Sequence, residues 1–384
     1  MKKYCFFLLS IFFCSTLLKA QSAGSNHIIQ FVFTSDAHYG IKRNNFRGDT
    51  DVDSYIVNEA MIKAINSISA LTLPEDHGVD AENSVGPVDY VIEGGDIANR
   101  MEIPIQPAAD SWKQFDADYI HGLTLKNHEG KPAQLFIIPG NHDITDAIGF
   151  YKPMNPLTDP TSMVQIYNLM LHPAVPLTNA DYDYNKDRIN YSRNINGIHF
   201  MFITLWPDSL ERKWMEKDLK TISLKTPVIL FTHDEPVCEV KQFTNPNPGH
   251  TINPVDKFQN LLAEQYKDGL KPPKDGGNTT LEQLGWVKFI KLHPNIKAYF
   301  HGNTNYNQFY IYGGPNNDVA LNTFRVDSPM KGEISRKDET KLSFLLVTID
   351  TRTMHMTVRE CLWNSDPKNP DKPVQWGESK TIIL

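Results

Sequence analysis

Short apolar runs that end in polar clusters recur along the chain and predict β-strands with functional residues at their ends. An apolar run at residues 135–138 is followed by Pro139 and Gly140, which interrupt a strand, and then by Asn141, His142 and Asp143. The same arrangement recurs after the apolar segments at residues 28–33, 88–92, 228–231 and 296–300.

Helical patterns separate these strands. Residues 53–70 carry apolar side chains at helical spacing behind an N-cap at Asp53 or Ser54. Further helices are predicted around Trp112, at 162–171, at 210–219 and at 281–292. A strand is expected at 198–205, and two paired strands at 342–350 and 354–362 complete the sheet. Loop-rich insertions are expected at 151–186 and 239–280; the second holds a predicted helix at 255–266 and is a candidate substrate-side lid.

Strand ends separated by crossovers converge on one rim of an α/β sheet, so the polar residues after these strands are expected to meet. Carboxylate, imidazole and amide oxygen ligands together suit divalent metals such as manganese, iron or zinc, and a shared carboxylate can bridge two ions. Two ions in such a site hold a phosphate and activate a water molecule. The converging residues are Asp36, His38, Asp96, Asn141 and His233.

The chain of 384 residues is 40% hydrophobic and 22% charged, which is ordinary globular composition for one large domain or two smaller ones. Residues 1–20 have the lysines, apolar run and small-residue exit of a secretory signal, and the run is too short to span a bilayer. Cys14 raises a lipoprotein alternative, but Phe12 and Phe13 precede it where small residues are needed. Cleavage after Ala20 and a secreted or periplasmic location are therefore expected.

Removal of residues 1–20 deletes three lysines and no acidic residue, which takes the formal net charge from −7 to −10. Such an acidic chain is poorly suited to bind nucleic acid or an anionic membrane. Cys238 and Cys361 remain, and the sequence leaves open whether they pair. It also leaves the oligomeric state open.

The motifs at residues 36–38, 95–96, 140–143 and 233 resemble, in order and spacing, those of the calcineurin-like metallophosphoesterases, over about residues 28–350. The resemblance implies a four-layer αββα sandwich of two mixed sheets, formed as a single domain from residue 21 onward. It implies Asp36 and His38 as ligands of a first metal and Asp96 as a bridge.

The same resemblance assigns Asn141 and His233 to a second metal, His142 as general acid and Asp143 as its orienting partner. A histidine that only positions Asn141 is the alternative role of His142.

The last motif departs from the family. Where the family has Gly-His-x-His, whose histidines complete the second and first metal sites in turn, this chain has Gly302-Asn303-Thr304-Asn305. Amide oxygens are weaker ligands that favour harder ions, so Asn303 and Asn305 predict lower affinity and a shift toward manganese, magnesium or calcium. His301 is an alternative ligand if the strand continues past it, although the Gly302 turn argues against this.

Other polar and aromatic residues have less specific interpretations. Asn99 stands where purple acid phosphatases have a metal-binding tyrosine, so a purple iron site is not expected. Arg100 either holds a phosphate or pairs with an acid. Three histidines away from strand ends are interpreted as surface or lid residues: His199, His250 and His293. Four aromatic residues either line the substrate entrance or pack on the sheet: Tyr306, Phe309, Tyr310 and Tyr312.

The sequence therefore predicts a phosphoesterase that hydrolyses a phosphomonoester or phosphodiester of a small molecule, lipid or sugar with a metal-bound hydroxide at a dinuclear site. No nucleophilic serine or cysteine stands among the motifs, so no covalent intermediate is expected. Two alternatives stay open: a non-catalytic member that binds a phosphate- or sugar-bearing ligand, and an enzyme with a single metal.

Overall fold

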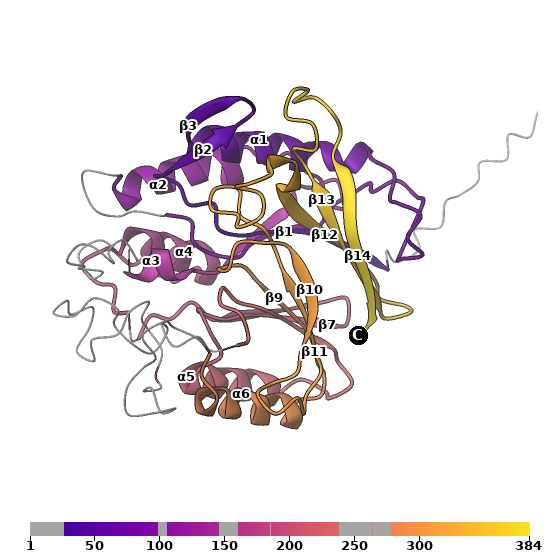
Figure 1. Ribbon diagram of the computed structural model, residues 1–384. Helices are drawn as coiled ribbons and strands as arrows, with labels where there is room; N and C mark the ends of the chain where they lie inside the picture. Colours follow the sequence, from indigo (N-terminus) through magenta and orange to yellow (C-terminus); the bar gives the residue numbers. More distant parts are fainter. Residues whose placement is uncertain (1–26, 99–105, 146–159, 185, 238–262, 264–277) are drawn as a thin grey trace, which may run out of the picture.

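Two six-stranded sheets stack face to face between layers of helices (Figure 1). The computed structural model describes residues 27–98, 106–145, 160–184, 186–237, 263 and 278–384. Several predictions concern segments outside the described residues: the signal at 1–20, Asn99, Arg100, Cys238, His250 and the helix at 255–266. Among the described residues, no helix combines the length and apolar character needed to cross a bilayer.

The first sheet has the order β14-β13-β12-β1-β4-β5. Its parallel part joins β1 to β4 and β4 to β5, whereas β12, β13 and β14 are added as an antiparallel meander beside β1. The strands are β1 (Ile28–Thr34), β4 (Tyr90–Glu93), β5 (Gln134–Ile137), β12 (Ser343–Asp350), β13 (His355–Leu362) and β14 (Gln375–Ile383).

The second sheet has the order β10-β11-β9-β8-β7-β6. The four central strands run parallel, and β10 and β6 are antiparallel edges. The strands are β6 (Tyr191–Ile195), β7 (Ile198–Phe202), β8 (Val228–Phe231), β9 (Ile296–His301), β10 (Gln308–Tyr312) and β11 (Leu321–Arg325). A separate hairpin consists of β2 (Lys42–Phe46) and β3 (Asp49–Asp53).

Helices cover the outer faces of both sheets. In Figure 1, α1 and α2 lie over the first sheet and α5 and α6 over the second. The α-helices are α1 (Ser54–Ser67), α2 (Ala108–Phe115), α3 (Asn141–Thr145), α4 (Thr161–Leu171), α5 (Ser209–Leu219) and α6 (Leu281–Leu292). Two 3₁₀ turns, η1 (Ile68–Ala70) and η4 (Glu339–Lys341), and a π-helical segment, η2 (Asp116–His121), complete the elements of the described part.

Phenylalanines fill the space between the two sheets. The ring centroid of Phe31 on β1 lies 5.8 Å from that of Phe200 and 5.7 Å from that of Phe231, both on the second sheet. Phe33 and Phe300 make a similar contact at 5.4 Å. Successive side chains of a strand point to opposite faces of its sheet, so every second residue of these apolar runs faces the other sheet. Each sheet therefore presents aromatic side chains to the other.

The α/β sandwich predicted from the sequence is confirmed. Helix α6 has the predicted bounds, and β12 and β13 pair as expected. The strand expected to reach residue 205 ends earlier, at Phe202, since Leu205 adopts a positive φ of 56° that does not fit a strand. Asp53 is the N-cap residue of α1, but its side chain makes no capping hydrogen bond.

Candidate metal centre

The residues after β1 and β4 continue the parallel pairing of these strands beyond the sheet. The Asp36 amide donates to the Gly95 carbonyl at 2.8 Å, and the His38 amide donates to the Asp96 carbonyl at 2.9 Å. This pairing brings the side chains of Asp36, His38 and Asp96 to one point on the rim, as the strand pattern predicted.

The backbone at this point is tightly constrained. Asp36, His38 and Asp96 have left-handed φ values of 61°, 44° and 60°. A non-glycine residue in this region is strained, by roughly 1–3 kcal/mol, so the surrounding structure must hold all three in place. Gly95 has a φ of +97°, and a Cβ there would lie 2.4 Å from the Gly140 amide nitrogen. Only glycine allows the two loops to approach so closely.

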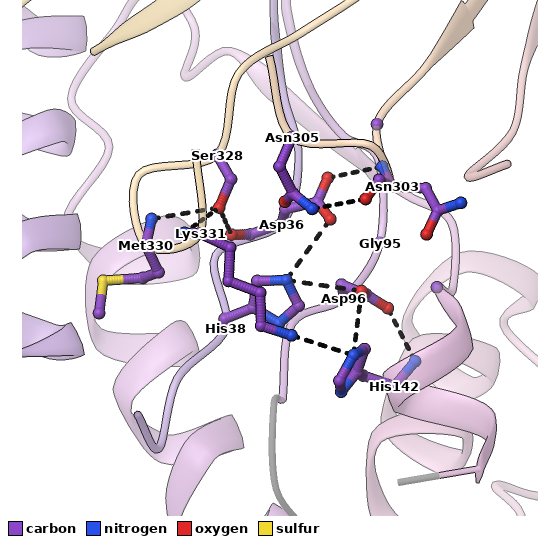
Figure 2. Close-up of polar contacts among 12 residues, drawn as sticks. Asp36, His38, Gly95, Asp96, His142, Asn303, Asn305, Ser328, Met330 and Lys331 are labelled. Carbon is purple, nitrogen blue, oxygen red and sulfur yellow. Dashed lines mark hydrogen bonds and ion pairs between the residues drawn. The ribbon is translucent and has the colours of Figure 1, made fainter. Parts of the chain in front are cut away.

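Asp96 lies at the centre of the candidate site. Its carboxylate oxygens lie 3.6 Å from His38 Nε2, 3.4 Å from His233 Nε2 and 3.9 Å from His142 Nε2. The His142 backbone amide also donates to Asp96 Oδ1 at 2.8 Å. Figure 2 shows the His38 and His142 rings next to each other beside the carboxylate, and their ring centroids lie 4.9 Å apart.

Two overlapping groups of side chains can hold a metal ion, and Asp96 belongs to both. One group is His38, Asp96 and His142, and the other is Asp36, Asp96 and His233; the ligand atoms of each group lie within 4.8 Å of one another. Asp36 Oδ1 and both ring nitrogens of His38 are buried without a hydrogen-bond partner. Such atoms normally cost about 1–3 kcal/mol each, so a bound cation would satisfy them and the residues fit a metal centre.

The charges in this cluster support one another. Burial disfavours the ionised form of Asp96, yet the imidazoles of His233 and His142 hold its pKa well below the usual range. In the same way, burial opposes protonation of His233, but the Asp96 and Asp36 carboxylates raise its pKa well above the usual value. Asp96 is therefore ionised and available as a ligand at neutral pH.

Asn141 and His233 meet across the rim from β5 and β8. His233 Nδ1 donates to the Gly94 carbonyl at 2.7 Å, which turns Nε2 toward Asn141 Oδ1, 3.2 Å away, and toward Asp96. The bond to Gly94 fixes the ring orientation, as is usual for metal-binding histidines. Asn141 begins the short helix α3 rather than an open turn.

The chain matches the family described as calcineurin-like phosphoesterase over residues 29–302, which is most of its length. It belongs to this family. Among curated proteins, none matches the chain.

Two solved structures resemble this member of the family. A dimetal phosphatase from Danio rerio has 10% identity and a TM-score of 0.49, with 92% of this chain and 98% of that chain covered. A Vps29 variant from Entamoeba histolytica has 8% identity and a TM-score of 0.33, with 92% and 99% covered.

Asp143, predicted to orient His142, makes hydrogen bonds with the backbone. Its Oδ2 accepts from the Gly140 amide at 2.9 Å and from the Ile97 amide at 3.2 Å, and Oδ1 accepts from the Ala98 amide at 3.2 Å. Burial, reinforced by Asp96, raises the pKa of Asp143 to about 7. Asp143 thus ties the loop after β4 to the loop after β5, and its proposed effect on the His142 ring remains a prediction.

The altered family motif lies beside Asp36. The Asn303 amide donates to Asp36 Oδ2 at 3.0 Å, while its side chain points away from Asp36 and donates to Glu235 Oε2 at 3.0 Å (Figure 2). Asn305 Nδ2 donates to the Asn303 carbonyl at 2.5 Å, and Asn305 Oδ1 is buried without a hydrogen-bond partner. Asn305 therefore keeps an oxygen available as a ligand, and both ligand roles remain predictions.

The alternative ligand His301 is engaged elsewhere. Its Nδ1 donates to the Gly302 carbonyl at 3.0 Å, and its Nε2 lies 2.9 Å from the Tyr310 hydroxyl. Tyr312 is buried and donates to Gln283 at 2.8 Å, so this part of the aromatic run packs against the fold.

The prediction that His199 lies on the surface or in a lid is wrong. His199 is buried on β7 and lies 2.6 Å from Asp218 and 2.7 Å from Asn194, which satisfy both of its ring nitrogens. A histidine within an apolar strand is more naturally a core residue with polar partners. His293 is half-buried and lies 2.9 Å from Glu216.

Two residues near the centre were missed by sequence reasoning. Glu235 follows His233 by two residues and contacts Asn303. Lys331 follows β11, a strand that was not predicted, and its Nζ lies 3.0 Å from His142 Nε2. The available signal for Lys331 was the same as for the other sites: a short strand followed by polar residues.

Proposed function

We propose that this protein is a metal-dependent phosphoesterase with a dinuclear centre. The observation that carries the proposal is the position of Asp96, whose carboxylate faces three imidazoles and belongs to both candidate metal groups. A shared carboxylate between two sets of ligands is the arrangement that a pair of metal ions requires. Membership of the calcineurin-like phosphoesterases supports the same chemistry.

One ion would be held by Asp36, His38 and Asp96. The other would be held by Asp96, Asn141 and His233, and Asn303 and Asn305 are further candidate ligands. When bound, such ions supply Lewis-acid stabilisation of a phosphoryl group and lower the pKa of water. The side chains that would hold them are fixed before any ligand arrives, because the strained loop backbone and the Gly94 carbonyl determine their orientation.

His142 is the proposed proton donor to the leaving oxygen. Its side chain is 12% exposed, whereas those of His38, Asp96 and His233 are at most 3% exposed. His142 is therefore the imidazole of the cluster that a substrate arriving from solvent meets first. The bond from its backbone amide to Asp96 keeps the ring beside the reacting centre.

The proposed substrate is a phosphomonoester or phosphodiester of a small molecule, lipid or sugar. The acidic charge of the chain supports an assignment away from nucleic acid. We also infer export and cleavage after Ala20, on the pattern of residues 1–20. Sequencing the amino terminus of the protein recovered from its native host tests this; an intact terminus contradicts it.

The direct test is metal analysis of the purified protein, followed by hydrolysis of bis(p-nitrophenyl) phosphate and p-nitrophenyl phosphate with added Mn²⁺. We expect bound metal, turnover, and a loss of about 100-fold or more in His142→Ala, since general acid catalysis contributes about 10²–10⁴-fold. His293→Ala is the control, because His293 pairs with Glu216 away from the centre. Absence of metal and of turnover with every divalent ion refutes the proposal.

A non-catalytic, ligand-binding member of the family is the second candidate. It is favoured by the Asn303 side chain, which is directed to Glu235 and not to the Asp36 carboxylate. The double substitution Asn303→His with Asn305→His separates the two. If these positions are metal ligands, the variant binds Mn²⁺ more tightly; if they are not, its affinity is unchanged.

A further inference from the structure

Lys331 reaches into the candidate metal centre from a loop outside the family motifs described above. Residues 326–338, here called the Lys331 loop, directly follow β11. Because β11 runs parallel to β9, the loop emerges on the same rim as Gly302 and Asn303. Figure 2 shows the lysine side chain extending past His38 toward His142, where Nζ lies 3.0 Å from Nε2.

A serine hydroxyl ties the Lys331 loop to the segment after β1 that carries Asp36. Ser328 Oγ donates to the Asp36 carbonyl at 2.8 Å and accepts from the amides of Met330 at 3.1 Å and Lys331 at 2.9 Å. Ser328 is fully buried. The backbone of Lys331 is thereby positioned relative to a candidate metal ligand.

Two further contacts fix the other parts of the loop. The buried Arg43 guanidinium donates to the carbonyls of Pro329 at 2.8 Å and Ser335 at 2.6 Å. The Glu333 amide donates to the Asn305 carbonyl at 2.6 Å. The loop is therefore built against both the β2–β3 hairpin and the altered motif, and a lysine directed at the centre is a fixed feature of this fold.

The position of this charge is asymmetric within the centre. The ammonium group lies 3.0 Å from His142 Nε2, within the group His38, Asp96 and His142. By the family resemblance, Asn305 replaces the histidine that would complete the metal site of Asp36 and His38. A divalent cation there meets a weaker ligand and a repelling charge at the same time.

We propose that Lys331 is a substrate-binding residue whose ammonium group contacts a phosphoryl oxygen beside His38 and His142, and whose charge leaves the Asn141–His233 half of the centre as the tighter metal site. A lysine is a compact charge with three donors and binds phosphate well. The inference rests on the proposed function and specifies how one half of its centre works.

The test compares Lys331→Met with Lys337→Met, which removes the same charge from an exposed position of the same loop. Metal-stripped proteins are titrated with Mn²⁺, and the Mn²⁺-loaded proteins with inorganic phosphate, both by calorimetry. We expect a tight and a weak Mn²⁺ equivalent in the wild type. In Lys331→Met the weak equivalent tightens at least tenfold and phosphate binding weakens at least tenfold, while Lys337→Met behaves as wild type.

Two Mn²⁺ equivalents of equal affinity in the wild type overturn the inference, as does Lys331→Met with wild-type affinities for Mn²⁺ and phosphate. Circular dichroism checks the fold, and Lys331→Gln replaces the Met variant if the latter does not fold. Hydrolysis of bis(p-nitrophenyl) phosphate is read separately. Absence of turnover in the wild type refutes the phosphoesterase, whereas turnover with unchanged binding in Lys331→Met refutes only the role of Lys331.

Discussion

Gly140→Ala should disable the metal centre through a steric clash. A Cβ at Gly140 would lie 2.2 Å from Asp96 Oδ1 and 2.3 Å from the Asp96 amide nitrogen, whereas ordinary contact begins at 3.4 Å. One of the two loops must therefore move by roughly 1 Å. The φ of Gly140 is not positive, so the effect isolates the clash from backbone strain.

Overpacking of this kind costs about 1–3 kcal/mol in the free energy of unfolding. A displacement of about 1 Å at a catalytic group lowers the rate by roughly 100-fold. We therefore expect weaker Mn²⁺ binding and a loss of bis(p-nitrophenyl) phosphate hydrolysis that exceeds what the modest loss of stability explains. Urea denaturation, Mn²⁺ calorimetry and the hydrolysis assay measure the three quantities.

Gly197→Ala is the matched control. Gly197 lies in the turn between β6 and β7 with a φ of +85°, and a methyl group added there would meet nothing within 4 Å. Its substitution costs about 1–2 kcal/mol through left-handed strain, with metal affinity and rate unchanged. Wild-type Mn²⁺ affinity and rate in Gly140→Ala would contradict a steric clash at Asp96.

Two further predictions concern stability. Phe231→Ala should lower the free energy of unfolding in urea by about 3–5 kcal/mol, because the fully buried ring is central to the inter-sheet core. Leu224→Ala, at a side chain that is 65% exposed, should change it by less than about 0.5 kcal/mol. Equal effects of the two substitutions would contradict the central position of Phe231. Asp118 accepts a hydrogen bond from Tyr39 at 2.6 Å, and burial raises its pKa from 3.8 to about 6. The folded state thus binds this proton more tightly than the unfolded state, so the free energy of unfolding should fall as the pH rises from about 4 to about 6. Asp118→Asn should reduce this slope. Identical slopes for the wild type and the variant in urea titrations would refute the prediction.

The candidate metal centre is built mainly from features that the sequence predicts. Each of the strands β1, β4, β5 and β8 is a short apolar run that ends at polar residues, and parallel strands end on the same rim. The meeting of Asp36, His38 and Asp96 follows from that local pattern. His233 follows β8 of the second sheet, so its position beside Asp96 also depends on how the two sheets stack.

Several strands were not predicted because their sequences lack a clear apolar pattern. β14 is mostly exposed, and the β2–β3 hairpin is polar, so neither resembles a buried strand in sequence. These strands are stabilised by pairing with a neighbour, for example β14 with β13. Edge pairing depends on the partner surface, which a single segment does not encode.

Local sequence patterns were enough to indicate an α/β protein and the residues at the strand ends, because apolar runs and strand breakers act over a few positions. The sandwich of two sheets was implied by the family resemblance of the motifs. The partners of those residues depend instead on tertiary packing. Lys331 meets His142 across 189 positions of the chain, and Ser328 meets Asp36 across 292. These contacts join the loop after β11 of the second sheet to residues that follow β1 and β5 of the first sheet. They therefore depend on how the two sheets stack, which is set by the packing of the whole core and not by any one segment.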